Sequence, residues 1–503
     1  MLATIHAASL LGVRGHPVRV EVHVDNGLPA FNVVGLPDAS CKEARDRVRA
    51  ALVSSGLAWP SRRITVNLAP TGVPKAGAVL DLPMAVGLLV ACGEVEPWAV
   101  EDLAFLGELG LDGSVRPVPG ALPLVDAIEV AGVVVAPENA VEARLVDGPG
   151  VRSVPDLRHL ALALRGEEPW PEEAAPDAPD DPVADPDLAD VRGQRMARFA
   201  LEVAAAGNHH LLLIGPPGAG KSMLARRLPG LLPDLTGAQS LEVARVRSAA
   251  GESLPAGGLL RRPPWRAPHH GASAPSLVGG GSAAMRPGEV SLAHGGFLFL
   301  DELGEFAPKV LDALRQPLED GTVRVSRVDG SAEYPARVLL VAAMNPCPCG
   351  GSGAPGGCRC PEHVRLRYLR RVSGPLLDRF DLRVEVDRPD PLDLLGDGIG
   401  ESSAAVADRV AGVRRLAERR GVAANADLDA PSLADAGPLS AEASRLLEAS
   451  LHAGRLSARG LHRIRSVALT IADLTGREPP LGPDVVDTAL GLRIDPFRTP
   501  GIR

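Results

Sequence analysis

Residues 211–222 read LLLIGPPGAGKS, and the fold class follows from this stretch. Its first four residues are apolar, which is typical of a strand buried on both faces of a parallel sheet. The next eight match the phosphate-binding pattern G-x-x-x-x-G-K-[ST] between a strand and a helix; they are Gly215, Pro216, Pro217, Gly218, Ala219, Gly220, Lys221 and Ser222. The pattern predicts that Lys221 reaches the terminal phosphates of a nucleotide and that Ser222 ligates Mg²⁺. A glycine-rich turn that binds nothing is the alternative, which the flanking strand and helix disfavour.

Two further apolar runs end in polar residues. Residues 297–300 precede Asp301 and Glu302, and residues 338–343 precede Asn345. Ligands bind at the carboxyl ends of parallel strands. We expect Asp301 to serve the metal, Glu302 to deprotonate the attacking water and Asn345 to hold that water near the third phosphate. The sequence thus predicts ATP hydrolysis with ATP and Mg²⁺. Solvated acids at a strand end are the alternative, disfavoured by the phosphate loop upstream.

Two arginines are candidates to complete this site. Arg379 lies in GPLLDRFD (residues 374–381) and is a candidate arginine finger, presented by a neighbouring subunit to stabilise transition-state charge. A surface ion pair with Asp378 or Asp381 fits the spacing equally well. Arg459 begins a predicted helix from which it would contact the phosphates. Arg463 lies one turn further on, and the spacing does not choose between these two.

The chain divides into four regions. Residues 166–190 are proline-rich, with ten acidic and no basic residues, and predict an extended linker. Residues 1–165 mix short apolar runs with helical segments and predict an α/β domain; residues 191–400 predict a parallel-sheet P-loop core; residues 401–503 predict a helical lid. The expected strands of the first domain are 18–24, 64–68 and 133–136, its helices 40–55 and 81–92, and the lid helices 404–420, 440–451, 459–474 and 483–492.

Composition sets the class of protein. With 45% hydrophobic and 23% charged residues, the 503-residue chain is typical of a soluble globular protein. It has no uncharged apolar run of membrane-spanning length and no basic, then apolar, leader, which predicts a cytoplasmic protein without membrane contact. The formal net charge is −9, but the linker carries enough acid to leave the remainder nearly neutral. Net charge therefore neither supports nor excludes a polyanionic partner.

Four of the six cysteines crowd into residues 347–360. In a reducing compartment such a cluster indicates a metal before a disulfide. Four thiolates are enough for tetrahedral Zn²⁺, although the two C-x-C pairs are tighter than the usual C-x₂-C spacing. Free thiols in a flexible loop are the alternative. The residues are Cys347, Cys349, Cys358 and Cys360.

Several motifs together resemble the YifB/ComM family of magnesium-chelatase-like AAA+ ATPases. They are residues 31–52, 64–89, 215–222, 295–303, 341–350 and 373–381, so the resemblance spans nearly the whole chain. It implies a ring of six subunits with ATP sites at the seams, where Arg379 serves the neighbouring site and Arg459 is the lid arginine. It also implies a DNA motor that migrates branched joints during natural transformation. A chelatase-type or chaperone-like motor that remodels a protein partner is the alternative.

The first domain also resembles the proteolytic domain of Lon, which uses a serine and a lysine as a catalytic pair. Aligned with that domain, Val79 stands at the serine position and Leu122 at the lysine position. Neither side chain can perform the chemistry. The resemblance therefore implies a protease-like fold without peptidase activity.

Two basic segments are candidates for DNA contact. Residues 321–334 alternate around an Asp-Gly turn and predict a hairpin, similar to those that project into the pore of helicase-type rings, where Arg324 and Arg327 would meet phosphates. A solvated edge hairpin is the alternative. The second segment contains Arg359, Arg365, Arg367, Arg370 and Arg371, with Tyr368 among them. It could bind phosphates without regard to sequence, or it could simply be the solvated face of a helix. For His269 and His270, a loop facing the pore or the nucleotide is favoured over metal ligation.

Overall fold

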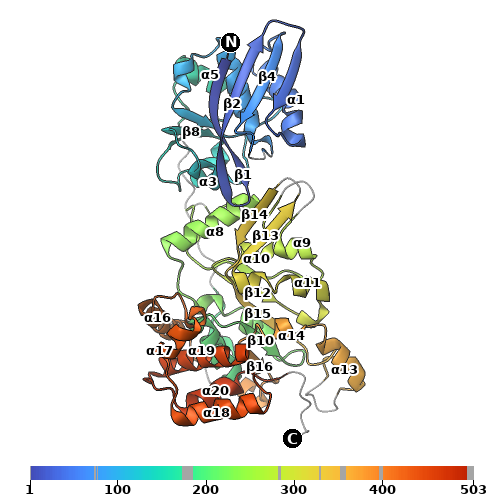
Figure 1. Ribbon diagram of the computed structural model, residues 1–503, viewed down its shortest axis with the longest axis vertical. Helices are drawn as coiled ribbons and strands as arrows, with labels where there is room; N and C mark the ends of the chain where they lie inside the picture. Colours follow the sequence, from blue (N-terminus) through green and yellow to red (C-terminus); the bar gives the residue numbers. More distant parts are fainter. Residues whose placement is uncertain are drawn as a thin grey trace.

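The computed structural model describes residues 2–72, 75, 77–172, 185–255, 257–280, 285–327, 330–351, 358–395 and 400–495. The N-terminal domain lies at one end of the long axis of the molecule (Figure 1). The nucleotide-binding core follows it, and the C-terminal helices lie beside the core toward the other end. Of the helices in these described ranges, none combines the length and apolar character that crossing a membrane requires.

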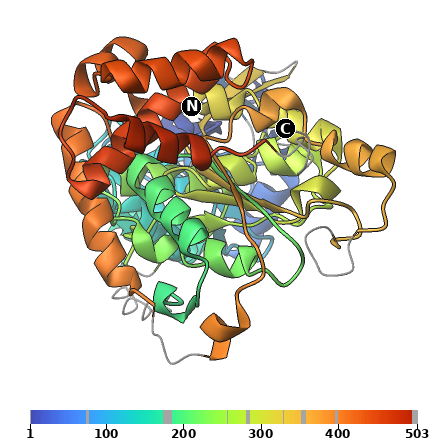
Figure 2. The ribbon, with the colours of Figure 1, turned by 90° about the horizontal axis from the view of Figure 1, so that it is seen from below.

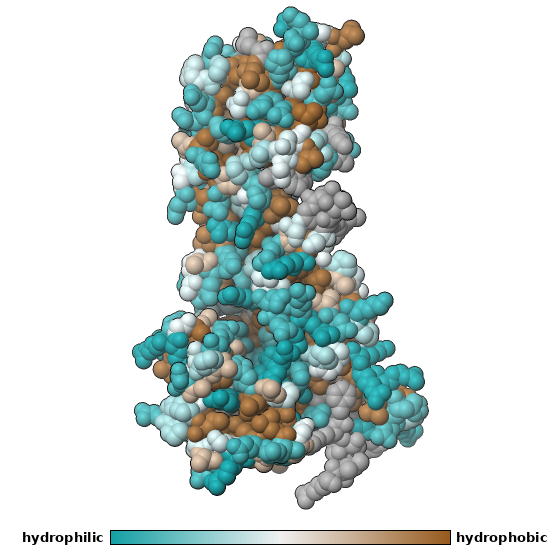
Figure 3. Space-filling view, viewed as in Figure 1, coloured by the Kyte–Doolittle hydropathy of each residue, from teal (hydrophilic) through white to brown (hydrophobic). Residues whose placement is uncertain are grey.

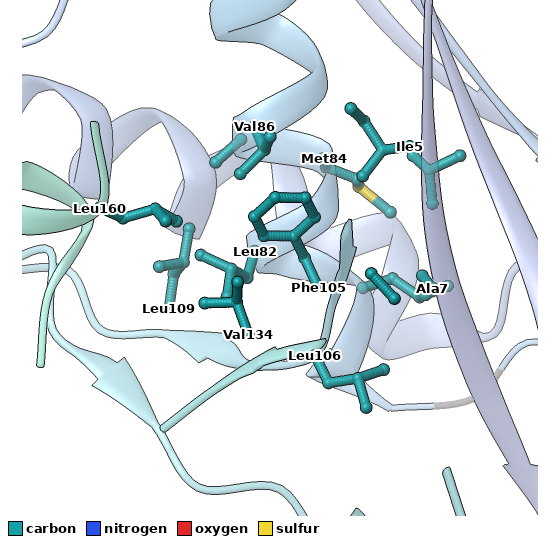
Figure 4. Close-up of a cluster of buried hydrophobic side chains, with 14 of the residues drawn as sticks. Ile5, Ala7, Leu82, Met84, Val86, Phe105, Leu106, Leu109, Val134 and Leu160 are labelled. Carbon is teal, nitrogen blue, oxygen red and sulfur yellow. The ribbon is translucent and has the colours of Figure 1, made fainter. Parts of the chain in front are cut away.

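The N-terminal domain is built on a seven-stranded mixed sheet of order β3-β4-β2-β1-β5-β8-β9. The predicted strands and helices are confirmed as β2, β4, β8, α1 and α2. Helix α2 is buried along its whole length and carries Leu82, Met84 and Val86 against Phe105 and Ile5 (Figure 4). The bounds are β1 (Leu2–Leu11), β2 (Arg14–Asp25), β3 (Ala30–Val34), α1 (Ala39–Ser54), β4 (Arg63–Ala69), α2 (Asp81–Ala91), β5 (Leu103–Phe105), α3 (Ala121–Asp126), β8 (Gly132–Val135), β9 (Gly150–Ser153) and α5 (Leu157–Arg165).

The core is a five-stranded parallel sheet of order β11-β12-β15-β10-β16. Every residue of β10, β12 and β15 is buried, as the continuous apolar runs predict. Successive side chains enter two separate hydrophobic clusters: Leu211 and Leu213 on one face of the sheet, Leu212 and Ile214 on the other. The strands are β10 (Leu211–Ile214), β11 (Trp265–Arg266), β12 (Phe297–Leu300), β15 (Leu339–Met344) and β16 (Leu382–Glu385); the flanking helices include α6 (Arg195–Gly207), α7 (Lys221–Ala225), α8 (Gly237–Ala250) and α9 (Ala274–Val278).

The predicted lid helices are confirmed, and they share one hydrophobic cluster with α6 and one face of the core sheet. Viewed from below, they lie beside the helices of the core (Figure 2). In the face shown in Figure 3, hydrophilic residues cover most of the core, while hydrophobic residues gather over the lid helices at lower left. The bounds are α16 (Ser403–Arg419), α17 (Ala430–Ala436), α18 (Ala441–His452), α19 (Ala458–Thr475) and α20 (Pro483–Gly491).

The two described ends of the acidic segment 166–190 belong to different units. Trp170 packs against the N-terminal domain, where the Arg152 guanidinium lies 4.4 Å from its ring centroid. Leu188 is buried in the core, and Arg227 donates a hydrogen bond to the Asp187 carbonyl at 2.8 Å. Residues 173–184 lie outside the described part. Burial of Leu188 and the hydrogen bonds to Asp187 therefore anchor this end of the segment to the core, although the average composition of the segment predicts an extended linker.

Contacts beyond the linker join the N-terminal domain to the core. Helix α3 packs on α8: the Gly120 N–H donates to the Ser248 carbonyl at 2.7 Å, and Arg245 pairs with Asp126 at 3.0 Å. Gly12 approaches Ala332 of the core hairpin so closely that a Cβ there would lie 3.0 Å from the Ala332 methyl. Backbone and side-chain contacts together therefore seat the domain on the core (Figure 1).

Candidate active site

The phosphate loop follows β10 and leads directly into α7. Gly218 (φ +77°) and Gly220 (φ +90°) adopt the left-handed backbone region, which glycine enters at little cost. Lys221 donates hydrogen bonds to the Gly215 carbonyl at 2.7 Å, the Pro216 carbonyl at 3.0 Å and Asn345 Oδ1 at 3.1 Å. Burial lowers the pKa of Lys221, and the charges of Asp301 and Glu302 oppose this shift. The loop therefore holds the Lys221 ammonium group at the carboxyl ends of the sheet strands.

The acidic pair lies directly against this loop. Ser222 Oγ donates to Asp301 Oδ2 at 2.6 Å, and the Glu302 N–H donates to Asp301 Oδ1 at 2.9 Å. Hydroxyl and carboxylate oxygens are hard donors that suit Mg²⁺. A cavity of about 350 Å³ joins the two halves; its lining residues are Pro217, Gly218, Gly220, Lys221, Ser222, Met223, Asp301, Glu302, Ala343, Met344 and Asn345. The structure thus gathers the predicted nucleotide site from three strand ends.

His270 reaches this site by way of β11. Since β11 runs parallel to β12, the loop after β11 lies at the same sheet edge as the acidic pair. His270 Nδ1 lies 3.1 Å from Glu302 Oε2, and the edge of its ring meets Phe306 at a centroid distance of 6.4 Å. Glu302 itself has a positive φ of +53°, unusual for a residue with a side chain. The sequence predicts a loop facing the pore or the nucleotide, and the structure adds that His270 contacts the predicted water-activating glutamate.

Replacing His270 by alanine should therefore lower kcat for ATP about 10- to 100-fold, because the Glu302 carboxylate loses the group that orients it. KM for ATP should change little, since His270 is not among the residues that line the pocket. His269→Ala is the matched control: its ring lies 4.0 Å from that of His270, but its Nδ1 accepts the Gly271 N–H. Steady-state ATPase kinetics of both variants test this, and equal losses in both would contradict a specific role for His270.

Gln194 also contacts the phosphate loop, and the sequence does not mark it by charge or periodicity. It lies just before α6 in a left-handed conformation (φ +52°). Its side-chain amide donates to the Ala219 carbonyl at 3.1 Å and also to the Asp387 carbonyl beyond β16. Gln194 thus ties the phosphate loop to the segment after the neighbouring strand.

The two candidate arginines lie together, but away from this pocket. Arg379 precedes β16 whereas the phosphate loop follows β10, and the two strands are parallel, with Leu211 opposite Leu382. The length of β10, about 13 Å, therefore separates the arginine from its own phosphate loop. Neither Arg379 nor Arg459 is among the residues that line the cavity.

A single carboxylate, Glu319, holds both arginines. Arg379 donates to Glu319 and to the Pro375 carbonyl, and Arg459 Nη2 lies 2.6 Å from Glu319 Oε1. The alternative partners of Arg379 are engaged elsewhere: Asp381 pairs with Arg463, and Asp378 lies near Arg383 and Arg493. The structure therefore groups Arg379 with Arg459 rather than with Arg463.

Three family models match in succession: "Magnesium chelatase, subunit ChlI" over residues 187–394, "Subunit ChlI of Mg-chelatase" over 20–139 and "Magnesium chelatase, subunit ChlI C-terminal" over 400–493. YifB of Escherichia coli is 44% identical over 482 residues, covering 94% of this chain and 93% of YifB. Competence protein ComM of Haemophilus influenzae is 42% identical over 501 residues, covering 98% and 97%. The chain belongs to the YifB/ComM magnesium-chelatase-like family.

An uncharacterized protein of Mycobacterium tuberculosis, another relative, is 47% identical over 510 residues and 98% of each chain. Membership in the YifB/ComM family implies ATPase activity of the AAA+ type and suggests ATP and Mg²⁺ as cofactors. The parallel-sheet core and the helical C-terminal unit fit that fold.

The predicted hairpin of this family member is confirmed as β13 (Thr322–Arg327) paired with β14 (Gly330–Pro335). Arg324 is 68% exposed, and its guanidinium lies 3.1 Å from Glu333. An exposed ion pair of this kind contributes little stability, so an anion such as a phosphate group could displace Glu333 from Arg324. The side chain of Arg327 lies outside the described part.

The second basic segment of the YifB/ComM chain has two kinds of residue. Arg359, Arg367 and Arg370 are exposed and Arg365 half-buried, in and around α13 (Glu362–Leu369). Tyr368 is buried instead, packed against Gly304 so tightly that a Cβ there would lie 2.4 Å from the ring. Arg371 donates to the Gly304 carbonyl at 2.9 Å. Tyr368 and Arg371 therefore attach α13 to the loop after Glu302.

The four cysteines that the sequence marks as candidate metal ligands lie close together in the structure. Their Sγ atoms all lie within 4.8 Å of one another, an arrangement that could hold a metal ion. Cys349 Sγ lies 3.4 Å from both Cys347 Sγ and Cys358 Sγ, and no disulfide joins them.

Proposed function

We propose that this YifB/ComM family member is an ATP-hydrolysing DNA translocase that acts as a homo-oligomeric ring, with six subunits as the family resemblance implies, and promotes branch migration of joined DNA. The observation that carries the proposal is the distance, set by the length of β10, between Arg379 and its own phosphate loop. This distance supports an arginine finger that acts on the site of another subunit rather than on its own. A ring whose ATP sites lie at its seams allows this at every subunit.

Each residue of the half-site has one task in hydrolysis. Lys221 binds the terminal phosphates, and Ser222 and Asp301 would hold Mg²⁺, which when bound neutralises phosphate charge. Glu302 accepts a proton from the attacking water while the water oxygen bonds to the γ-phosphorus. The bond from that phosphorus to the β–γ bridging oxygen breaks, and ADP leaves. Asn345, whose Oδ1 accepts a hydrogen bond from Lys221 at 3.1 Å, would orient the water.

In this proposal Arg379 and Arg459 act together on the neighbouring site. Because both contact Glu319, a nucleotide that reaches one arginine lies near the other. Phosphate charge competes with Glu319 for the two guanidinium groups, since charge-assisted bonds to phosphate are strong and often bidentate. Glu319 would then hold the finger when the neighbouring site carries no γ-phosphate.

DNA as the substrate is supported by the exposed Arg324 on the hairpin and by similarity to a protein named for competence. Phosphate contacts carry no sequence information, which suits a motor that moves along any DNA. The N-terminal domain would have the fold of the Lon proteolytic domain without its activity. Val79 and Leu122, at the positions of the serine and lysine, are both buried aliphatic residues.

The family models name magnesium chelatase, which supports a second candidate, a chelatase-type or chaperone-like motor that remodels a protein partner. DNA dependence separates the two candidates. A protein-remodelling motor needs no response of its ATPase to DNA, whereas a translocase hydrolyses ATP in step with its movement along the strand.

We therefore expect single-stranded, duplex or four-way DNA to raise the ATPase rate, and the protein to displace strands from forked and four-way substrates. The apparent affinity for DNA should fall at least about tenfold between 50 and 200 mM salt. Binding releases the cations condensed on the DNA phosphates, and added salt opposes that release. Arg324→Ala should weaken the stimulation, while Arg261→Ala, which removes an exposed arginine paired with Asp234 elsewhere on the core, should not. ATPase unaffected by every DNA, with no displacement, would favour the protein-remodelling alternative.

A further inference from the structure

We propose that Cys347, Cys349, Cys358 and Cys360 bind one Zn²⁺, and that this ion links the loop after Asn345 to helix α13 on the flank of the ATP site. Tetrahedral zinc with sulfur ligands at about 2.3 Å places those sulfurs about 3.8 Å apart. The Cys349 Sγ lies 3.4 Å from two other thiol sulfurs, and all four lie within 4.8 Å of one another. Small shifts of these side chains would make the four sulfurs a tetrahedral ligand set.

The backbone around the cluster supplies hydrogen-bond donors to the sulfurs. The Gly351 N–H donates to Cys349 Sγ at 3.4 Å, and the Cys360 N–H donates to Cys358 Sγ at 3.3 Å. In each of the two C-x-C pairs, therefore, one cysteine sulfur accepts a hydrogen bond from the backbone N–H group two residues further along the chain. Such outer-shell donors stabilise charge on a thiolate and orient it toward a metal. Each C-x-C pair therefore forms a turn in which a backbone N–H group orients the sulfur of its first or second cysteine.

The first pair of cysteines lies beside the phosphate loop. Cys347 follows Asn345 by two residues and is fully buried. Gly350 lies so close to Pro217 that a Cβ would be 2.6 Å from the Pro217 ring, and its φ of +71° also favours glycine. The turn that carries Cys347 and Cys349 therefore packs directly on the phosphate loop.

The second pair leads into α13, which is attached at its far end to the other side of the site. Tyr368 and Arg371 hold that end against Gly304, two residues after Glu302. An ion bound by all four thiolates would fasten the near end as well, giving α13 two anchors, one beside Asn345 and one beside Glu302. The basic helix would then keep a fixed position relative to the nucleotide.

Metal analysis of the purified full-length protein tests the site without any activity assay. Wild type and Cys92→Ser, which removes an exposed thiol of the N-terminal domain, should each retain about one zinc per chain, whereas Cys349→Ser and Cys360→Ser should retain less than about a fifth of that. Co²⁺ exchanged into the wild type should give the thiolate charge-transfer absorption of a tetrahedral four-sulfur site. The proposal would be overturned if the wild-type protein held under a fifth of a zinc per chain even after incubation with Zn²⁺. It would also be overturned if the mass of the chain were 2 Da below that expected for free thiols, since this would show a disulfide among the four cysteines.

Limited proteolysis tests the link between the ion and α13. Trypsin should cleave near Arg359, Arg367 and Arg370 at least about tenfold faster after a thiol-specific mercurial and a chelator remove the metal, because one anchor of the helix is lost. Cleavage at exposed Arg261 should not change and serves as an internal control. Removing the mercurial with excess thiol and then restoring zinc should restore protection, which excludes irreversible unfolding. Equal cleavage rates with and without the metal would show that the ion does not hold the helix.

Discussion

Lys221→Ala should lower the ATPase rate by at least about 100-fold, because the pocket loses the cation placed among the phosphate loop, Asp301 and Asn345. Lys221 is buried and donates to three acceptors within 3.1 Å. Among the described residues that line the pocket, Lys221 is the one with a cationic side chain, so no other lining residue can replace its ammonium group. Strand displacement should disappear together with hydrolysis. The rate is measured by phosphate release at saturating ATP.

Lys309→Ala provides the control, because Lys309 is an exposed lysine of the same core domain on α11 (Pro308–Ala313). It should hydrolyse ATP at the wild-type rate. Thermal unfolding of both variants separates loss of chemistry from loss of structure. A Lys221→Ala protein that is folded and retains more than about half the wild-type rate would contradict the assignment of this pocket as the ATP site.

Mixing two inactive variants should restore hydrolysis. Arg379→Ala alone should lose about 10³-fold in kcat, the usual effect of removing an arginine finger. In rings assembled at random from equal amounts of Arg379→Ala and Lys221→Ala subunits, one seam in four pairs an intact phosphate loop with an intact finger. The mixture should therefore recover about one quarter of the wild-type rate if the finger acts in trans.

A second mixture controls for this result. Lys221→Ala and Glu302→Gln both damage the half-site that one subunit contributes, so no seam of their mixed ring is complete and the mixture should stay inactive. Equal recovery in the two mixtures, or none in either, would contradict a seam site completed by Arg379. Size-exclusion chromatography of each mixture with ATP confirms that assembly has occurred.

The strands and helices that were expected lie close to observed ones, but no expected element corresponds to β1, β3, β5, β9, α3, α5, α6 or α8. Strands β10 and β12 coincide with their apolar runs, and β15 is displaced by one residue. The lid helices lie within about one residue of the predicted bounds, since an apolar face that repeats every three to four residues is a local property. Strand β11 was missed because two residues, Trp265 and Arg266, are too short for any periodicity to be visible.

The nucleotide half-site could also be predicted, because each of its residues follows an apolar strand and the ends of parallel strands meet at one edge. Lys221 with Asn345, and Ser222 with Asp301, are in direct contact as that reasoning requires. The contact of His270 with Glu302 could not be predicted in the same way. It depends on β11 pairing with β12, and nothing near His270 in the sequence encodes that pairing.

By itself, then, the sequence determined the phosphate loop, its acidic pair and the asparagine, since short runs of residues specify them. Only the tertiary structure decided that Arg379 and Arg459 share Glu319 at the opposite sheet edge, and that four thiols separated by up to thirteen positions converge within 4.8 Å. The physical reason is that strand order and direction place residues distant in sequence together. The phosphate loop needs only its own strand and helix, whereas the finger and the cysteine cluster depend on how separate segments pack.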